Sequence, residues 1–167
     1  TTGKEMTQIM DTFTKMSGNN YSPGTITGKP IPVGGSLARN VATGLGNAYC
    51  IREAAKILNI ELKGAKVVLQ GFGNASTFSG EYLEKMGATC IAASDSKGSI
   101  LVPDGFKVQE LIDWKQKEGS VVGYPGSKEI STEELLTTEC DVLVPGALEN
   151  QITAEIAEKL KCKIIGE

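Results

Sequence analysis

The sequence contains no histidine among its 167 residues. This absence excludes a Ser-His-Asp or Cys-His catalytic centre within the chain, and any metal site that depends on histidine ligands. The four cysteines form no Cys-x-x-Cys pair, which disfavours a zinc or dithiol redox site. Each cysteine stands among apolar residues, so we expect buried, reduced thiols and no metal site. Aromatic residues make up only 5% of the chain, which predicts a core of aliphatic side chains and alanine.

The chain also lacks an excess of basic charge and any long apolar run. Lysine and arginine total 17 against 20 acidic residues, so the formal net charge is −3. Nucleic-acid-binding domains and polybasic membrane-binding segments carry basic patches, which this balance disfavours. No apolar run approaches the ~18 residues of a membrane span, and the N-terminal residues do not have the pattern of a secretory signal. We expect a cytoplasmic protein without nucleic-acid or membrane partners.

Two regions of the chain differ in their residue patterns. In residues 1–38, apolar residues at helical spacing predict a helix over 4–16, and Gly and Pro then predict a structured loop over 22–35. In residues 39–167, short apolar strands alternate with helices. The predicted helices are 40–58, 75–86, 107–117, 131–136 and 153–160. The predicted strands are 66–70, 89–94, 141–144 and 163–165, with a short extended piece over 99–102. Such alternation predicts a Rossmann-like, doubly wound α/β fold with a mostly parallel sheet and helices on both faces.

The sharpest motif is the glycine turn Gly71-Phe72-Gly73-Asn74-Ala75-Ser76. It directly follows the strand predicted over 66–70 and opens a helix, which is the context that a dinucleotide-binding turn requires. Gly71 allows a tight turn, and Gly73 lets a pyrophosphate approach the backbone at the N-terminus of the helix. Ser76 stands where the pattern usually has a third glycine. The alternative is a glycine turn that binds nothing.

Asp95 supplies the second half of this pattern. It ends the strand predicted over 89–94 and lies 22 residues after Gly73. An acidic residue at this place accepts hydrogen bonds from the adenosine ribose hydroxyls and repels a 2′-phosphate. Lys97 is a nearby cation that could compensate for this repulsion. The sequence therefore favours NAD and leaves NADP possible, and the alternative role for Asp95 is that of an ordinary cap.

Several segments together resemble the glutamate dehydrogenase family, which includes glutamate, leucine, phenylalanine and valine dehydrogenases. The order and spacing of the motifs are those of its cofactor domain over nearly the whole chain. The segments are 27–30 (TGKP), 34–39 (GGSLAR), 42–46 (ATGLG), 68–74 (VLQGFGN), 94–98 (SDSKG), 144–152 (VPGALENQI) and 163–167 (KIIGE). The chain departs from the family at Ala38, where glycine is usual, and at Gly146, where alanine is usual. It also has Ser76 where the family has glycine or another small residue.

The resemblance implies roles for individual residues. Thr43 would bond the nicotinamide carboxamide, Asn74 would contact the pyrophosphate or a ribose, and Gly146 and Ala147 would line the adenosine side. Without the resemblance, Thr43 reads as a packed helical residue and Asn74 as a helix N-cap. Arg39 would orient the nicotinamide end or pair with an acid. The full predicted cofactor-binding set is Arg39, Thr43, Gly71, Phe72, Gly73, Asn74, Ala75, Asp95, Ser96, Gly146, Ala147 and Asn150, and Asn150 could instead cap the helix over 153–160.

The resemblance further implies that the catalytic groups lie outside this chain. We expect residues 1–38 to lead from a missing catalytic domain and residues 39–167 to form a C-terminally truncated NAD(P)-binding domain. The parent enzyme would be a homohexamer that converts L-glutamate reversibly to 2-oxoglutarate and ammonium, and the fragment alone would be inactive. Open alternatives are the cofactor domain of a leucine, phenylalanine or valine dehydrogenase, a non-catalytic nucleotide-sensing module, and a scaffold or oligomerisation domain.

Overall fold

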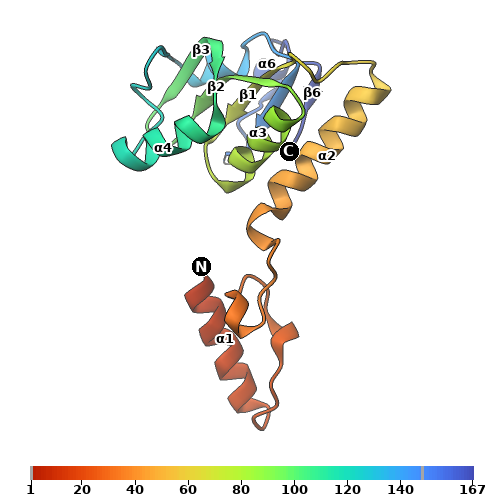
Figure 1. The fold of residues 1–167 in the computed structure, drawn as a ribbon, viewed down its shortest axis with the longest axis vertical. Helices are drawn as coiled ribbons and strands as arrows, with labels where there is room; N and C mark the ends of the chain where they lie inside the picture. The colour runs from red at the N-terminus through yellow and green to blue at the C-terminus, as the bar shows by residue number, and fades with distance from the viewer. Residues whose placement is uncertain (1, 148) are drawn as a thin grey trace. The chain divides into compact units, whose positions relative to one another are not determined.

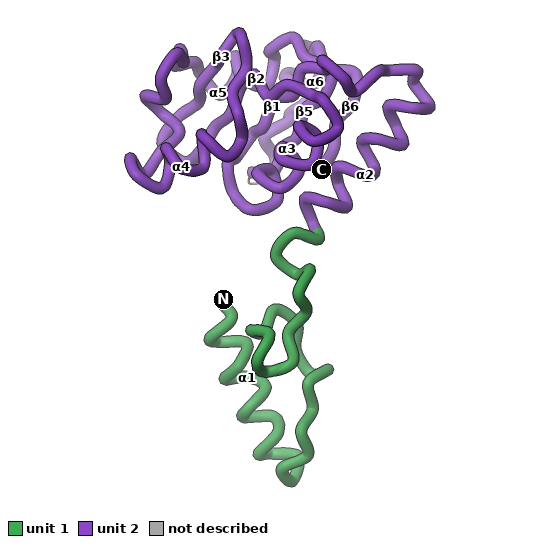
Figure 2. Tube along the Cα trace, viewed as in Figure 1, with its two compact units in different colours: residues 1–42 green, residues 43–167 purple. Residues whose placement is uncertain are grey.

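The computed structural model describes residues 2–147 and 149–167. Figure 2 shows the two compact units into which the chain divides, residues 1–42 and residues 43–167. The sequence predicts a boundary four residues earlier, after residue 38.

The first unit contains helix α1 (Gly3–Met16) and two short 3₁₀ turns, Pro23–Thr25 and Ile31–Val33. The helix begins with a capping box, in which the Thr2 side chain accepts from the backbone of Lys4 and Glu5 reaches back to Thr2 N at 2.6 Å. The loop rich in Gly and Pro closes around the buried Lys29, whose Nζ donates to the carbonyls of Pro23 and Ile26. The predicted helix and structured loop are confirmed.

The remaining strands build a six-stranded sheet with the order β4-β3-β2-β1-β5-β6. Figure 1 shows β3, β2 and β1 following one another in this sheet. Neighbouring strands are parallel except in the pairs β2–β3 and β3–β4, so β3 alone among the described strands runs against the others. This confirms the predicted mostly parallel sheet. The helices are α2 (Arg39–Ile57), α3 (Asn74–Lys85), α4 (Val108–Glu118), α5 (Thr132–Leu136) and α6 (Ala154–Ala157). The strands are β1 (Lys66–Gln70), β2 (Thr89–Ser94), β3 (Ser99–Phe106), β4 (Lys128–Ile130), β5 (Val142–Pro145) and β6 (Ile164–Ile165).

Strand β3 is longer than the sequence predicts. Its register against β2 shifts between Ala92, which faces Leu101, and Cys90, which faces Phe106. The extra residues in β3 include Gly105, which has a positive φ of 83°. The residues around Gly105 therefore make a bulge inside the strand, and the extended piece predicted over 99–102 is the first half of a longer strand. Helix α6 is shorter than predicted, and the three-residue strand β4 was not predicted.

The sheet is covered on both faces, as predicted. Apolar residues of α2, α3 and α4, including Ile51, Leu83 and Leu111, share one core with the side chains on one face of the sheet. Leu135 of α5 belongs to a second core on the other face, against which partly buried Ile156 of α6 packs. Both cores are mainly aliphatic, although the first also contains Phe72 and Phe106 and packs against Tyr82, Trp114 and Tyr124. Cys90 and Cys140 are buried in these cores and Cys162 is partly buried, but Cys50 is exposed, so the prediction of burial was wrong for Cys50.

The strand order creates a switch point beside β1. The chain passes from β1 through α3 to β2 on one side and later returns to place β5 on the other side. Connections that leave a parallel sheet in opposite directions open a crevice at the carboxyl ends of the two strands, and ligands bind there in such folds. The glycine turn follows β1 and the segment 146–147 follows β5, so both predicted segments lie at this edge.

Candidate functional site

The turn after β1 has the geometry that its glycines predict. Gly71 has a positive φ of 82°, a conformation that favours glycine, and its N–H donates to Ser94 Oγ at 2.9 Å. Gly73 is the N-cap of α3 and is extended, and no side chain caps the helix. Asn74 is the first helical residue, so the alternative that it is the N-cap is wrong. The first N–H groups of α3 thus lack a side-chain acceptor, and such groups at a helix N-terminus can bind an anion.

A central cleft of about 530 Å³ opens in front of this turn. It lies at the carboxyl ends of β1, β2 and β5, where the strand order places the switch point. Seven of the predicted residues line it: Gly71, Phe72, Gly73, Asp95, Ser96, Gly146 and Ala147. The sequence pattern did not single out four further residues of the lining: Gln70, Ser94, Lys115 and Thr132. The cleft also takes in Gln151, whereas the predicted Asn150 is exposed and lies outside its lining.

The Asp95 carboxylate is engaged by the protein itself. Its side chain is only 5% exposed. Oδ1 accepts from Lys97 N at 2.8 Å and from Ser120 Oγ at 3.2 Å, and Oδ2 accepts from Val121 N at 2.8 Å, with Lys115 Nζ 3.8 Å away. Burial raises the pKa of the Asp95 carboxyl, but these hydrogen bonds and Lys115 outweigh it, so the pKa lies below its usual value. Few lone pairs remain free for a ribose.

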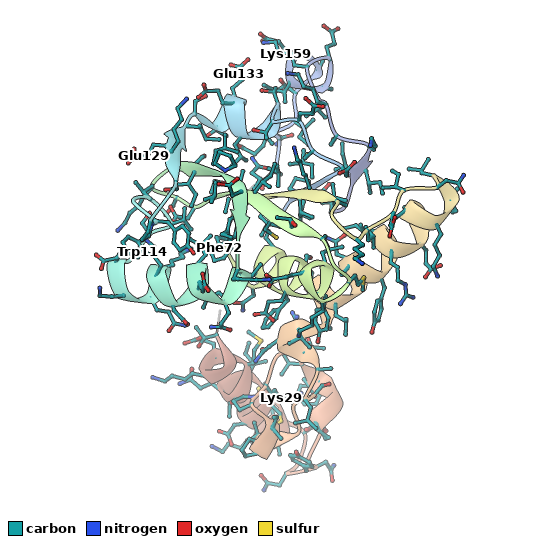
Figure 3. The ribbon with its side chains drawn as sticks, turned by 45° about the horizontal axis from the view of Figure 1, so that its top comes forward. Lys29, Phe72, Trp114, Glu129, Glu133 and Lys159 are labelled. Carbon is teal, nitrogen blue, oxygen red and sulfur yellow. The ribbon has the colours of Figure 1, made fainter. Side chains whose placement is uncertain are left out.

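Lys115 is the cation that the structure brings into the central cleft. Its Nζ donates to the carbonyl of Phe72 at 2.9 Å and lies 5.8 Å from the centre of that ring, which is labelled in Figure 3. The same lysine lines a second hollow of about 540 Å³, the α3–α4 groove, together with Asn74. The cation that the sequence suggests, Lys97, instead has its Nζ beside Gly119, outside the cleft lining. Lys115 can be identified as a residue of the cleft only from the packing of α4 against α3.

A side cavity of about 260 Å³ lies next to the central cleft. Thr43 and Ala75 line it, and Gly146 and Ala147 line both hollows. Asn47, one helical turn after Thr43, fixes α2 at this cavity, because its Nδ2 donates to Gly166 O at 3.0 Å and to Ser79 Oγ at 3.2 Å. Arg39 is exposed and belongs to the first unit, so its role stays a prediction.

Within the described ranges, no three histidine, cysteine or acidic side chains gather as a metal site would require. No helix in the described part of the chain is long and apolar enough to cross a membrane.

The uncapped α3, the glycine turn and the switch-point cleft define a Rossmann-like dinucleotide-binding fold. Comparison with known families makes the assignment more specific. The family model of the glutamate/leucine/phenylalanine/valine dehydrogenases matches residues 34–167. The chain belongs to this family.

Individual relatives are glutamate dehydrogenases. The chain is 40% identical to the NAD-specific glutamate dehydrogenase of Clostridioides difficile, over all of this chain and 41% of the relative. It is also 40% identical to the NADP-specific glutamate dehydrogenase of Saccharolobus shibatae, over all of this chain and 39% of that relative. The hetero-hexameric glutamate dehydrogenase from Thermus thermophilus, solved in a leucine-bound form, superposes with a TM-score of 0.89 at 31% identity. That match covers 99% of this chain and 39% of the solved chain. The chain thus spans about two fifths of the length of these relatives.

Proposed function

We propose that this chain is the cofactor-binding domain of a glutamate dehydrogenase, which oxidatively deaminates L-glutamate to 2-oxoglutarate and ammonium and passes hydride to NAD(P). The observation that carries the proposal is the uncapped N-terminus of α3 behind the Gly71–Gly73 turn, at the switch point of the sheet. The names of the relatives support glutamate as the substrate of the whole enzyme.

The residues around the turn fit an extended dinucleotide. The free N–H groups at Gly73 and Asn74 would hold the pyrophosphate. The adenosine would lie in the central cleft, beside the end of β2, and the nicotinamide would lie in the side cavity. There the Thr43 hydroxyl can both donate to and accept from the carboxamide. The bound nicotinamide supplies the hydride chemistry, while the protein positions the ring and selects the face that it presents.

The hydrogen bonds at Asp95 change its proposed role. The sequence predicts that its carboxylate receives both ribose hydroxyls, but three donors already occupy that carboxylate. We therefore assign the ribose to the exposed Ser96 and give Asp95 the role of holding the surrounding segments. NAD is the proposed cofactor, and NADP stays open because Lys115 would favour a 2′-phosphate. Relatives specific for each cofactor have similar identity to this chain.

We further propose that the chain alone binds dinucleotide but is inactive, and that the catalytic groups lie in the rest of a cytoplasmic homohexameric enzyme. The resemblance to the family supports this, because its substrate-binding lysines and catalytic aspartate match no segment of this sequence. Purified chain incubated with L-glutamate and NAD is expected to form no NADH. Measurable NADH formation would contradict this part of the proposal.

Dinucleotide binding is tested by titrating the 167-residue chain with NAD and with NADP while its thermal unfolding is followed. A ligand at 100 times its Kd stabilises the folded state by about 2.7 kcal/mol. For a protein of this size that raises Tm by roughly 5–10 °C. Absence of a shift with either nucleotide at millimolar concentration contradicts the proposal.

The variant Gly73→Asp tests whether the glycine turn is the dinucleotide-binding site. The backbone of Gly73 is extended at φ −101°, and an added Cβ has no neighbour within 4 Å, so the side chain fits. The new carboxylate would cap α3, which stabilises a protein by only about a few tenths of a kcal/mol relative to a glycine cap, and would repel a pyrophosphate. We expect a higher Tm without nucleotide and no further shift with it. A nucleotide-induced shift equal to that of the wild-type chain would show that the turn is not the binding site.

A further inference from the structure

Two of the departures from the family pattern face each other at the base of the central cleft. Ser76 lies in the first turn of α3 and is completely buried. Gly146 follows β5, and a Cβ added to it would overlap Ser76 Oγ, with Ser76 Cβ only 3.2 Å away and Ser76 N at 3.5 Å. The serine hydroxyl therefore occupies the volume that an alanine methyl at position 146 would need.

Hydrogen bonds hold both residues in place. Ser76 Oγ donates to the carbonyl of Gln70 at 3.4 Å, and Gly146 N donates to the same carbonyl at 2.8 Å. On the other side, a Cβ on Gly71 would stand 2.8 Å from Gly146 O. The backbone after β5 is thus enclosed between Ser76 and the glycine turn after β1, and it cannot move away from a new methyl without moving a wall of the cleft.

We propose that Ser76 and Gly146 are a coupled pair of positioning residues that sets the distance between the glycine turn and the segment 146–147. Gly146 must lack a side chain as long as Ser76 keeps its hydroxyl. This inference rests on the proposed dinucleotide site. Gly146 and Ala147 line both the central cleft and the side cavity, so their displacement alters the space for both halves of the cofactor.

A double-mutant cycle tests the pair. NADH binding is measured at a temperature where Gly146→Ala, Ser76→Ala, the double variant and the wild-type 167-residue chain are all folded. Gly146→Ala is expected to weaken binding at least ~tenfold and to lower Tm by about 4–8 °C, because it overpacks a buried site. Ser76→Ala alone is expected to change the Kd less than about twofold, and the double variant to return to within about threefold of wild type.

The control is Gly46→Ala, which adds the same methyl to a helical glycine with no atom within 4 Å of the new Cβ. Its NADH affinity is expected to equal that of the wild-type chain. A Gly146→Ala variant that binds as the wild type does, or a double variant that is no better than Gly146→Ala, overturns the coupling. If the wild-type chain binds no dinucleotide, the proposed function fails. The Tm values of the same four proteins then still decide whether Ser76 and Gly146 are coupled.

Discussion

Replacing Asp95 with asparagine distinguishes the two roles available to this residue. Asparagine keeps one acceptor oxygen and puts an amide donor in place of the other. At least one of the N–H groups of Lys97 and Val121 then faces another donor instead of a carboxylate oxygen. Loss of one hydrogen bond to a charged group costs about 1.5–3 kcal/mol, so we expect Tm to fall by roughly 4–10 °C.

The assay is thermal unfolding combined with separate titrations of NAD and NADP. If Asp95 holds the segments around the cleft, both affinities fall together, and the ratio of the two dissociation constants changes by less than about twofold. If its carboxylate instead receives the ribose hydroxyls, NAD binding weakens while NADP binding improves, because the repulsion of the 2′-phosphate is lost. That change in the ratio, with an unchanged Tm, would refute our reasoning. Asp113→Asn, on the exposed side of α4, is the control and is expected to alter neither quantity.

The pH dependence gives a further check on the same substitution. The pKa of Asp95 is lower in the folded chain than its usual value, so its contribution is complete above the pKa of the unfolded chain. This contribution disappears as the pH falls through the folded-state pKa. The difference in stability between wild type and Asp95→Asn should therefore be greatest near neutral pH and shrink in the acid range. A difference that stays constant down to acid pH would show that the carboxylate charge is not involved.

One further substitution tests the cleft, and one cysteine-labelling experiment tests the core. Lys115→Met should weaken NADP binding about fivefold or more and NAD binding by less, because the substitution removes the cation from the cleft and keeps the aliphatic part of the side chain. Equal losses of affinity for the two nucleotides in parallel titrations would contradict this. In the folded chain, an alkylating reagent should modify the exposed Cys50 quickly. Cys90 and Cys140 should react only after unfolding, because burial raises the pKa of each thiol to about 12. Mass spectrometry of labelled peptides checks this order, and rapid labelling of Cys90 in the native state would contradict the burial.

The parts of the site that the sequence predicts are those encoded locally. A tight glycine turn between a buried strand and a helix needs particular residues within a few positions of one another, so Gly71 and Gly73 could be assigned from the pattern alone. Strand β3 shows the limit of local signals. Its Pro, Asp and Gly residues are typical of a turn, yet pairing with β2 on both sides of them holds them as a bulge within a continuing strand. Tertiary pairing overrode the local preference there.

Lys115 and Asn47 mark what no local pattern could supply. Each lies on a correctly predicted helix, and nothing in its own segment distinguishes it from other polar helical residues. Lys115 enters the site because α4 brings it to the carbonyl of Phe72, which lies 43 positions away. Asn47 enters the site because α2 brings its side chain to the carbonyl of Gly166, which is 119 positions away. Only the packed structure determines contacts of such separation.

Asp95 combines both situations, since its position is predictable and its role is not. The spacing from the glycine turn correctly locates an acidic residue at the end of β2, beside the cleft. Whether that carboxylate is free for a ligand depends on Ser120 and Val121, which follow α4 and approach Asp95 only through the fold. Three donors from the protein stabilise the charged carboxylate and leave little capacity for two ribose hydroxyls. An acidic residue at this spacing therefore identifies the edge of the sheet where we propose that the dinucleotide binds, but the donors around it decide whether it would bind the cofactor or shape the site.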